Sequence, residues 1–90
     1  MATLSDDEIA KRMKALPGWT REGDGLRRTF TFPRFADAIT FVNRVAEHAE
    51  RLDHHPDILV EYTKVTLTST SHDAGGITAR DFALATAVSG

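Results

Sequence analysis

Four histidines lie in the second half of this 90-residue chain, and three of them stand where an element of secondary structure is expected to end. His54 and His55 are adjacent and precede Pro56, and His72 follows a second run of strand-forming residues. Imidazole exchanges protons near neutral pH, and histidine is costly to bury without a partner. Three imidazoles at such junctions therefore indicate a site for proton transfer or for a metal ion.

Two carboxylates are expected near these histidines. Glu50 precedes His54 by one helical turn, so the two side chains face the same junction. Asp81 falls in the first turn of the last predicted helix, after the loop that starts at His72. The sequence therefore predicts one concave site that holds three histidines and two carboxylates. His48, in the middle of a helix, is expected to have a surface or packing role instead.

Each carboxylate also has a structural interpretation. Asp81 follows Thr78 by three positions, which is an N-terminal capping pattern. Glu50 fits a solvated helix residue that pairs with His54. Gly75 and Gly76 are expected to serve a turn, because no phosphate-binding pattern accompanies them. These interpretations leave the convergence of three histidines unexplained.

Two chemistries suit the histidine cluster. Three neutral imidazoles are sufficient protein ligands for zinc, and imidazole is equally suited to general acid–base catalysis. Adjacent histidines in an extended segment diverge, and neither H-x-H nor H-x3-H spacing occurs among His54, His55 and His72. The spacing therefore favours acid–base catalysis without a metal ion or another cofactor.

The composition is that of a soluble globular protein, with 41% hydrophobic and 27% charged residues. Ninety residues fit a single domain over positions 1–90. The absence of cysteine excludes disulfides and thiolate chemistry. The net charge of −2 and the scattered basic residues do not favour direct nucleic-acid binding. No run approaches the ~20 apolar residues that a membrane span needs, and the acidic N-terminus is unlike a signal peptide, so we expect a cytoplasmic protein.

Hydrophobic periodicity and turn residues predict seven elements. These are a helix from Ser5 to Leu16, a hairpin over 19–32, a helix from about Phe35 to Leu52, a hairpin over about 57–70, and a last helix from Thr78. The order α-β-β-α-β-β-α predicts an α+β fold, in which helices pack on one face of a four-stranded antiparallel sheet.

The long helix and the second hairpin carry more detailed predictions. One buried stripe of the helix is expected to contain Phe35, Ala38, Ile39, Val42, Val45, Ala46, Ala49 and Leu52. A turn at Thr63-Lys64 would pair Val60 with Leu67, and the same register would place His55 opposite His72. Pro56 disfavours a helical conformation at the residue before it, so the long helix should end near the two adjacent histidines.

The candidate site residues also resemble the signature of a known family, the pterin-4a-carbinolamine dehydratases. The similar positions are Glu50-x-x-x-His54-His55-Pro56, Tyr62, Lys64-Val65, His72, Gly76-Ile77-Thr78 and Asp81. Upstream, Gly18-Trp19, Phe30-x-Phe32-x-x-Phe35 and Phe41…Val45-Ala46…Ala49-Glu50 are similar too. Ser71 and Ile77 stand where the family usually has threonine and leucine. The resemblance extends over nearly the whole chain.

This resemblance implies an enzyme that removes water from the 4a-hydroxytetrahydropterin released by aromatic amino acid hydroxylases. The product is the quinonoid dihydropterin, an intermediate in recycling a tetrahydrobiopterin-type cofactor. His54 and His72 would be the proton-transfer pair, and His55 would hold the pterin. Glu50 and Asp81 would orient imidazoles or bond the amino-pyrimidine edge of the substrate. Pro56, beside the bound pterin, would make the adjacent histidines project from the junction.

The resemblance also implies self-association as a dimer or tetramer and a functional link to an aromatic amino acid hydroxylase. Two alternatives remain open from the sequence. Some animal members of the family stabilise the dimer of a homeodomain transcription factor, so a protein-binding module on the same fold is the first. The second is a small zinc-dependent hydrolase.

Overall fold

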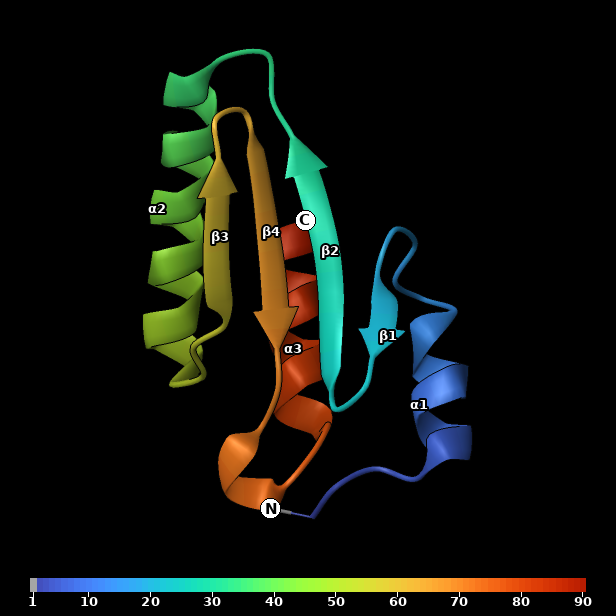
Figure 1. The fold of residues 1–90 in the computed structure, drawn as a ribbon. Helices are drawn as coiled ribbons and strands as arrows, with labels where there is room; N and C mark the ends of the chain where they lie inside the picture. Colours follow the sequence, from blue (N-terminus) through green and yellow to red (C-terminus); the bar gives the residue numbers. More distant parts are fainter. Residues whose placement is uncertain (1) are drawn as a thin grey trace.

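The structure, a computed structural model, describes residues 2–90. Its elements follow the predicted order, with one short 3-10 helix added before the last α-helix (Figure 1). They are α1 (Asp6–Met13), β1 (Thr20–Glu22), β2 (Gly25–Thr31), α2 (Phe35–Leu52), β3 (Asp57–Glu61), β4 (Lys64–Ser69), η1 (His72–Ala74) and α3 (Ala79–Ser89).

The strands form one antiparallel sheet in the order β1-β2-β4-β3. Helix α3 lies behind β4 and β2, α2 runs beside β3, and α1 lies beside β1 (Figure 1). Helices α2 and α3 also contact each other. The predicted α+β fold, with helices packed against one face of a four-stranded antiparallel sheet, is therefore confirmed. Strand β3 is left at one edge of the sheet, and β4, which leads to η1, is a central strand.

The hydrophobic core lies between the sheet and the helices. Its buried members include Leu26, Phe41, Val45, Ala49, Val65, Leu67, Leu84, Ala85 and Val88. The predicted stripe on α2 was only partly right, since Phe35 is 50% exposed and Ala46 is exposed. Phe41 is buried instead, with its ring centroid 4.6 Å from that of Phe30. The apolar arc of α2 is wider than the face that the sheet covers, so periodicity alone did not identify the buried edge of the arc.

The predicted turn of the second hairpin was wrong by one residue. The loop is Tyr62-Thr63, and the register pairs Val60 with Val65 instead of Leu67. Tyr62 has a positive φ of 53°, a conformation that usually selects glycine or asparagine, so residues 62–63 carry no turn signal. The backbone N–H of Phe32 donates to the carbonyl of Thr63 at 2.9 Å and ties this turn to the residue that follows β2.

Because the change of register is two residues, every side chain keeps the face that alternation predicted for it.

Among the described residues, no helix combines the length and the apolar character that crossing a bilayer requires.

Candidate functional site

The candidate residues lie at the end of the molecule where α2 and β4 finish and β3 and α3 begin (Figure 1). Helix α2 stops because Asp53 adopts the left-handed conformation, with φ 50° and ψ 45°. Its N–H and that of His54 donate to the carbonyls of Glu50 and Ala49, which satisfies the end of the helix. The chain then runs as an extended segment through Pro56 into β3.

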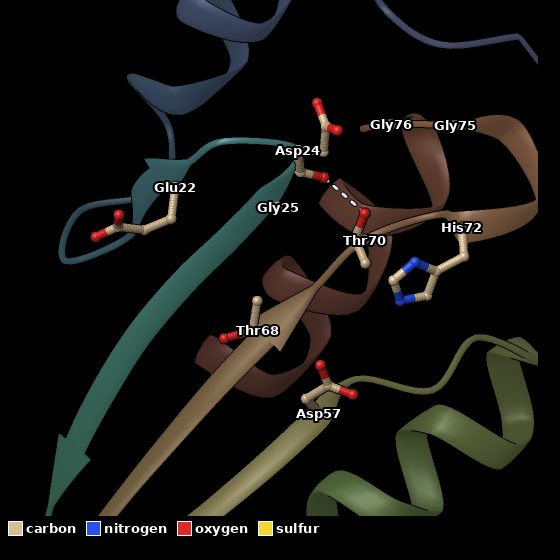
Figure 2. Close-up of a pocket in the computed structure, with 9 residues that line it drawn as sticks. All are labelled: Glu22, Asp24, Gly25, Asp57, Thr68, Thr70, His72, Gly75 and Gly76. Carbon is tan, nitrogen blue, oxygen red and sulfur yellow. Dashed lines mark hydrogen bonds between the residues drawn. The ribbon is translucent and has the colours of Figure 1, made fainter.

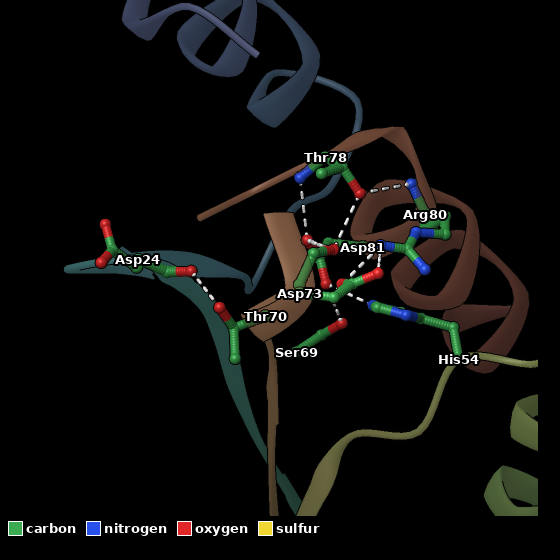
Figure 3. Close-up of polar contacts among 9 residues, drawn as sticks. Asp24, His54, Ser69, Thr70, Asp73, Thr78, Arg80 and Asp81 are labelled. Atoms are coloured by element: carbon green, nitrogen blue, oxygen red, sulfur yellow. Dashed lines mark hydrogen bonds and ion pairs between the residues drawn. The ribbon is translucent and has the colours of Figure 1, made fainter. Parts of the chain in front are cut away.

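His54 and Asp81 form a buried pair. Nε2 of His54 lies 2.6 Å from Oδ1 of Asp81, and the two side chains are only 8% and 0% exposed. The same carboxylate accepts hydrogen bonds from the hydroxyl of Ser69 at 2.6 Å and from the hydroxyl of Ser71 at 2.9 Å (Figure 3). Because Asp81 acts as an acceptor towards both hydroxyls, we assign the proton of this contact to Nε2 of His54.

In the neutral form of the imidazole, this assignment leaves Nδ1 of His54 as the acceptor nitrogen. Within residues 2–90, that atom has no hydrogen-bond partner and is not a fully buried atom, so it is in contact with solvent. The imidazole is therefore held through Nε2 by Asp81, whereas Nδ1 has no hydrogen bond to another described residue. An orienting carboxylate of this kind fixes both the tautomer and the direction of the ring.

Asp81 also caps α3, as its spacing from Thr78 predicted. The backbone N–H of Thr78 donates to Oδ2 of Asp81 at 2.9 Å, and the Thr78 hydroxyl accepts from the backbone N–H of Arg80 at 3.2 Å. The structural and functional interpretations of Asp81 are thus both compatible with one arrangement. Of the two functional roles predicted for Asp81, contact with the substrate does not fit its complete burial, and orientation of an imidazole does.

His55 and Glu50 form a second pair, on the surface. Nε2 of His55 lies 2.5 Å from Oε2 of Glu50, and the side chains are 57% and 77% exposed. The prediction that Glu50 pairs with His54 was therefore wrong. The left-handed turn at Asp53 directs His54 into the protein, and the next residue of the extended segment projects the opposite way. Pro56, between this segment and β3, is half-buried.

His72 lines a pocket of about 340 Å³, shown in Figure 2. The lining consists of Glu22, Asp24, Gly25, Asp57, Thr68, Thr70, His72, Gly75 and Gly76. Asp57 and Thr68 are partners in the sheet. The next pair, Ile58 and Leu67, lies on the opposite face, where Leu67 belongs to the core under the helices. The pocket therefore opens on the face of the sheet away from α2 and α3. Its lining contains three carboxylates and no lysine or arginine.

The five predicted polar residues do not all line this pocket. Only His72 does so, and the other four form the two pairs described above. The prediction of one concave site that holds all five residues is therefore not confirmed. The expected pairing of His55 with His72 was also wrong, since His72 belongs to η1 and His55 precedes β3.

Sequence reasoning missed the polar lining that the strands contribute. Asp57 follows Pro56 directly, and alternation along β3 places it on the face opposite to Ile58. That alternation was a usable signal for a polar side chain on this face of the sheet. Glu22 and Asp24 belong to the first hairpin, which lies close to η1 because β2 pairs with β4 in the sheet. The Thr70 hydroxyl donates to the carbonyl of Asp24 at 2.6 Å and joins the two segments.

The loop that carries His72 depends on two glycines. Gly75 has a φ of +82°, which side chains rarely tolerate. A Cβ on Gly76 would lie 3.2 Å from the side chain of Thr3. Both glycines thus serve the turn, as predicted. Nη2 of Arg51 donates a hydrogen bond at 2.6 Å to Nδ1 of His48 on the surface of α2, in agreement with the surface role predicted for His48.

Across residues 2–90, the structure contains no group of three or more histidine, cysteine, aspartate or glutamate side chains arranged to hold a metal ion. The arrangement instead combines a fixed, partly accessible imidazole, an exposed imidazole beside a carboxylate, and a third imidazole over a pocket rich in hydrogen-bond acceptors. Such groups can exchange protons with a small polar ligand.

Known proteins resemble the chain over almost its full length. Residues 2–90 match a family described as pterin 4 alpha carbinolamine dehydratase. A protein of Mycobacteroides abscessus with that provisional name is 55% identical over 85 residues, which cover 94% of this chain and 90% of the relative. A protein of Thermomicrobium roseum with the same provisional name is also 55% identical, over 94% of this chain and 91% of its own.

A solved structure shares the fold. The crystal structure of a transcriptional coactivator/pterin dehydratase from Brucella melitensis has a TM-score of 0.92 and 31% sequence identity. The similarity covers 97% of this chain and 95% of that chain.

Proposed function

The chain belongs to the pterin 4 alpha carbinolamine dehydratase family, and on this premise we propose that it removes water from a 4a-hydroxytetrahydropterin to give the quinonoid dihydropterin. Residues 1–90 would act as a single dehydratase-like domain. The observation that carries the proposal is the buried His54–Asp81 pair, which orients an imidazole at the end of the sheet where His72 lines a pocket.

The reaction needs two proton transfers. A proton must reach the departing 4a-hydroxyl, because hydroxide is a poor leaving group, and a proton must leave N5 of the ring. His54 and His72 are the proposed pair: His54 offers an acceptor nitrogen whose direction is set by Asp81, and His72 lies in the pocket wall. No metal ion or other cofactor takes part in this scheme.

His55 and Glu50 are proposed to hold the pterin at the rim of the site. Their pair is exposed, so either side chain can exchange its partner for a group of the ligand. The carboxylates of Asp57, Glu22 and Asp24 are suitable acceptors for the N–H groups of an amino-pyrimidine ring. Pro56 fixes the backbone between the histidines and Asp57.

We further propose that the enzyme is cytoplasmic and that it recycles the tetrahydrobiopterin-type cofactor of an aromatic amino acid hydroxylase. A homo-oligomer, as a dimer or tetramer, is supported by the edge strand β3. Its residues Ile58 and Leu59 are 38% and 50% exposed, and Tyr62 in the following turn is 76% exposed. An apolar edge strand is a site for pairing with another chain. Light scattering should therefore show an oligomer, and Leu59→Lys should shift it towards monomer.

A protein-binding module is the second candidate function. It is favoured by the name of the Brucella melitensis structure, which describes that protein as a transcriptional coactivator as well as a pterin dehydratase. A function by binding alone does not need the His54–Asp81 pair, so it predicts that His54→Ala leaves the function intact.

The decisive experiment is the decay of freshly generated 4a-hydroxytetrahydropterin, followed by ultraviolet absorbance. The protein should accelerate this decay, and His54→Ala and His72→Ala should each lower the acceleration by about 10²-fold or more, as expected for loss of a general acid or base. His48→Ala is the matched control and should retain full activity. Decay no faster than in buffer, from folded protein, would reject the dehydratase.

A further inference from the structure

An ion pair joins η1 to the first turn of α3. Nη2 of Arg80 lies 2.7 Å and 3.0 Å from the two carboxylate oxygens of Asp73 (Figure 3). The hydrogen bond from Arg80 holds the pKa of the Asp73 carboxyl below its ordinary value. The arginine side chain is 28% exposed and that of Asp73 is 69% exposed.

This pair is a poor source of stability. Asp73 is largely in solvent, where ion pairs contribute little. Nε of Arg80 is buried and has no hydrogen-bond partner among the described residues, and an unpaired buried donor is unfavourable. The buried, unpaired Nε of Arg80 lowers stability, and the exposed ion pair adds little stability in return. A positioning role therefore explains Arg80 better than a stabilising role.

Arg80 positions the tip of the loop over residues 71–76. Backbone hydrogen bonds close this loop on itself: the N–H groups of Ala74 and Gly75 both donate to the carbonyl of Ser71 at 3.0 Å. These bonds shape the loop but do not attach its tip to α3. The hydroxyl of Ser71, at the start of the loop, donates to Asp81 of α3 at 2.9 Å, and within residues 2–90 the Asp73–Arg80 contact is the further side-chain link, at the tip of the loop.

His72 precedes Asp73 and has no hydrogen bond of its own to another described side chain. Its ring in the pocket wall (Figure 2) therefore takes its position from the backbone of η1. We infer that Arg80 is a positioning residue that places the imidazole of His72 by holding Asp73. Asp81, the next residue of α3, holds His54 directly, so one turn of this helix sets the relative position of both imidazoles.

The catalytic part of this inference rests on the proposed function, which makes His72 a proton-transfer group. The placement of the loop does not rest on it. A displacement of about 1 Å in a reacting group can cost about 10²-fold in rate. Loss of the ion pair should consequently lower kcat and leave KM nearly unchanged, because the acidic lining that contacts the ligand stays in place.

The test compares Arg80→Gln, Arg80→Lys and Asp73→Asn with the parent protein. Arg80→Gln and Asp73→Asn should each lower kcat about 10-fold or more, with KM within about 2-fold and Tm close to that of the parent. Arg80→Lys should recover much of kcat, because Arg80 uses a single nitrogen on Asp73 and an ammonium group can make the same contact.

Arg34→Gln is the matched control. Arg34 forms an ion pair with Asp37 at 3.0 Å, also at a helix start, but at the opposite end of α2 from the site (Figure 1). The Arg34→Gln substitution should leave kcat, KM and amide exchange over residues 72–76 unchanged. In parallel, NMR of ¹⁵N-labelled protein should show faster amide exchange over residues 72–76 and a broadened His72 ring signal in Arg80→Gln and Asp73→Asn only.

The two proposals fail separately. If the parent has no dehydratase activity, the proposed function fails, and the NMR comparison alone decides the positioning role of Arg80. Unchanged exchange over residues 72–76 in Arg80→Gln would overturn that role. So would a kcat that falls only in step with Tm, or an equal loss in Arg34→Gln.

Discussion

Two adjacent histidines each bond a carboxylate through Nε2 at nearly the same distance, but in opposite environments. His54 and Asp81 lie 2.6 Å apart and are almost fully buried; His55 and Glu50 lie 2.5 Å apart and are mostly exposed. Leaving a buried polar group without its hydrogen-bond partner costs about 1–3 kcal/mol, whereas an exposed pair is worth about 0–1 kcal/mol. The difference shows that burial, and not the contact itself, decides what each pair can do.

The number of hydrogen bonds sharpens this contrast. Asp81 accepts four, from His54, Ser69, Ser71 and the backbone of Thr78. Glu50 accepts one, from His55. His54 is thus fixed by the fold before any ligand arrives, while His55 can turn to meet one. In the proposed mechanism, the buried pair would orient a proton acceptor and the exposed pair would adapt to the substrate.

The largest effect is expected for Asp81→Asn. The substitution keeps the shape of the side chain but replaces one acceptor oxygen by an NH2 group, so two buried donors lose their acceptor. At about 1–3 kcal/mol for each donor, the free energy of unfolding should fall by about 2–6 kcal/mol. Chemical denaturation measures this loss, and Glu50→Gln is the matched carboxylate control. Equal losses in the two variants would contradict the contrast between the pairs.

Replacing each histidine by alanine should affect both stability and activity differently in the two pairs. His54→Ala leaves the Asp81 carboxylate without one of its donors and should lower the free energy of unfolding by about 1–3 kcal/mol, in addition to its effect on kcat. His55→Ala should change stability by no more than about 0.5 kcal/mol and act mainly through a higher KM. Thermal unfolding and steady-state kinetics of the same preparations give both quantities. A kcat effect in His55→Ala as large as that in His54→Ala would remove the distinction.

A smaller effect is expected for Glu50→Gln. Glutamine can still accept a hydrogen bond from His55, and the exposed ion pair that it replaces is worth about 0–1 kcal/mol. The free energy of unfolding should therefore stay within that range of the parent value in a urea titration. A loss above about 2 kcal/mol would show that the surface pair is structural.

The smallest effect concerns pH and the exposed ion pair of Asp37 with Arg34. The hydrogen bond from Arg34 lowers the pKa of the Asp37 carboxyl. A lowered folded-state pKa means that the contribution of this pair is present above the ordinary pKa of aspartate and is lost as pH falls through the lowered value. The difference in Tm between the parent and Asp37→Asn should thus shrink in acid. A Tm difference that grows as pH falls would contradict the predicted direction of this pH dependence.

Much of the fold was predictable because its signals are local and strong. The amphipathic pattern of α2 and Pro56 gave the bounds of that helix, and Thr78 with Asp81 gave the start of α3. The second turn was not predictable, since Tyr62 in a left-handed conformation is uncommon for a bulky residue. The neighbouring strand, which anchors this turn through Thr63, is distant in sequence.

The sequence placed the histidines and carboxylates near one end of the sheet, but it did not predict how they pair or that only His72 of the five lines the pocket. Asp53 also adopts a left-handed conformation without being glycine, and this one residue decides that His54 points inward. The pocket lining was missed for a different reason. Asp57 and Thr68 have the alternation of a solvated sheet face, and only the loop over residues 71–76 turns that face into a pocket wall.

Asp81 gives one carboxylate two duties, the cap of α3 and the partner of His54. A substitution at this position that weakens the site also weakens the fold, so selection for abundance and selection for activity act on it together. At Glu50 the two selections are separate. In a library of single substitutions scored in cells for both properties, position 81 should lose abundance and activity in parallel, whereas position 50 should lose activity among variants that accumulate normally.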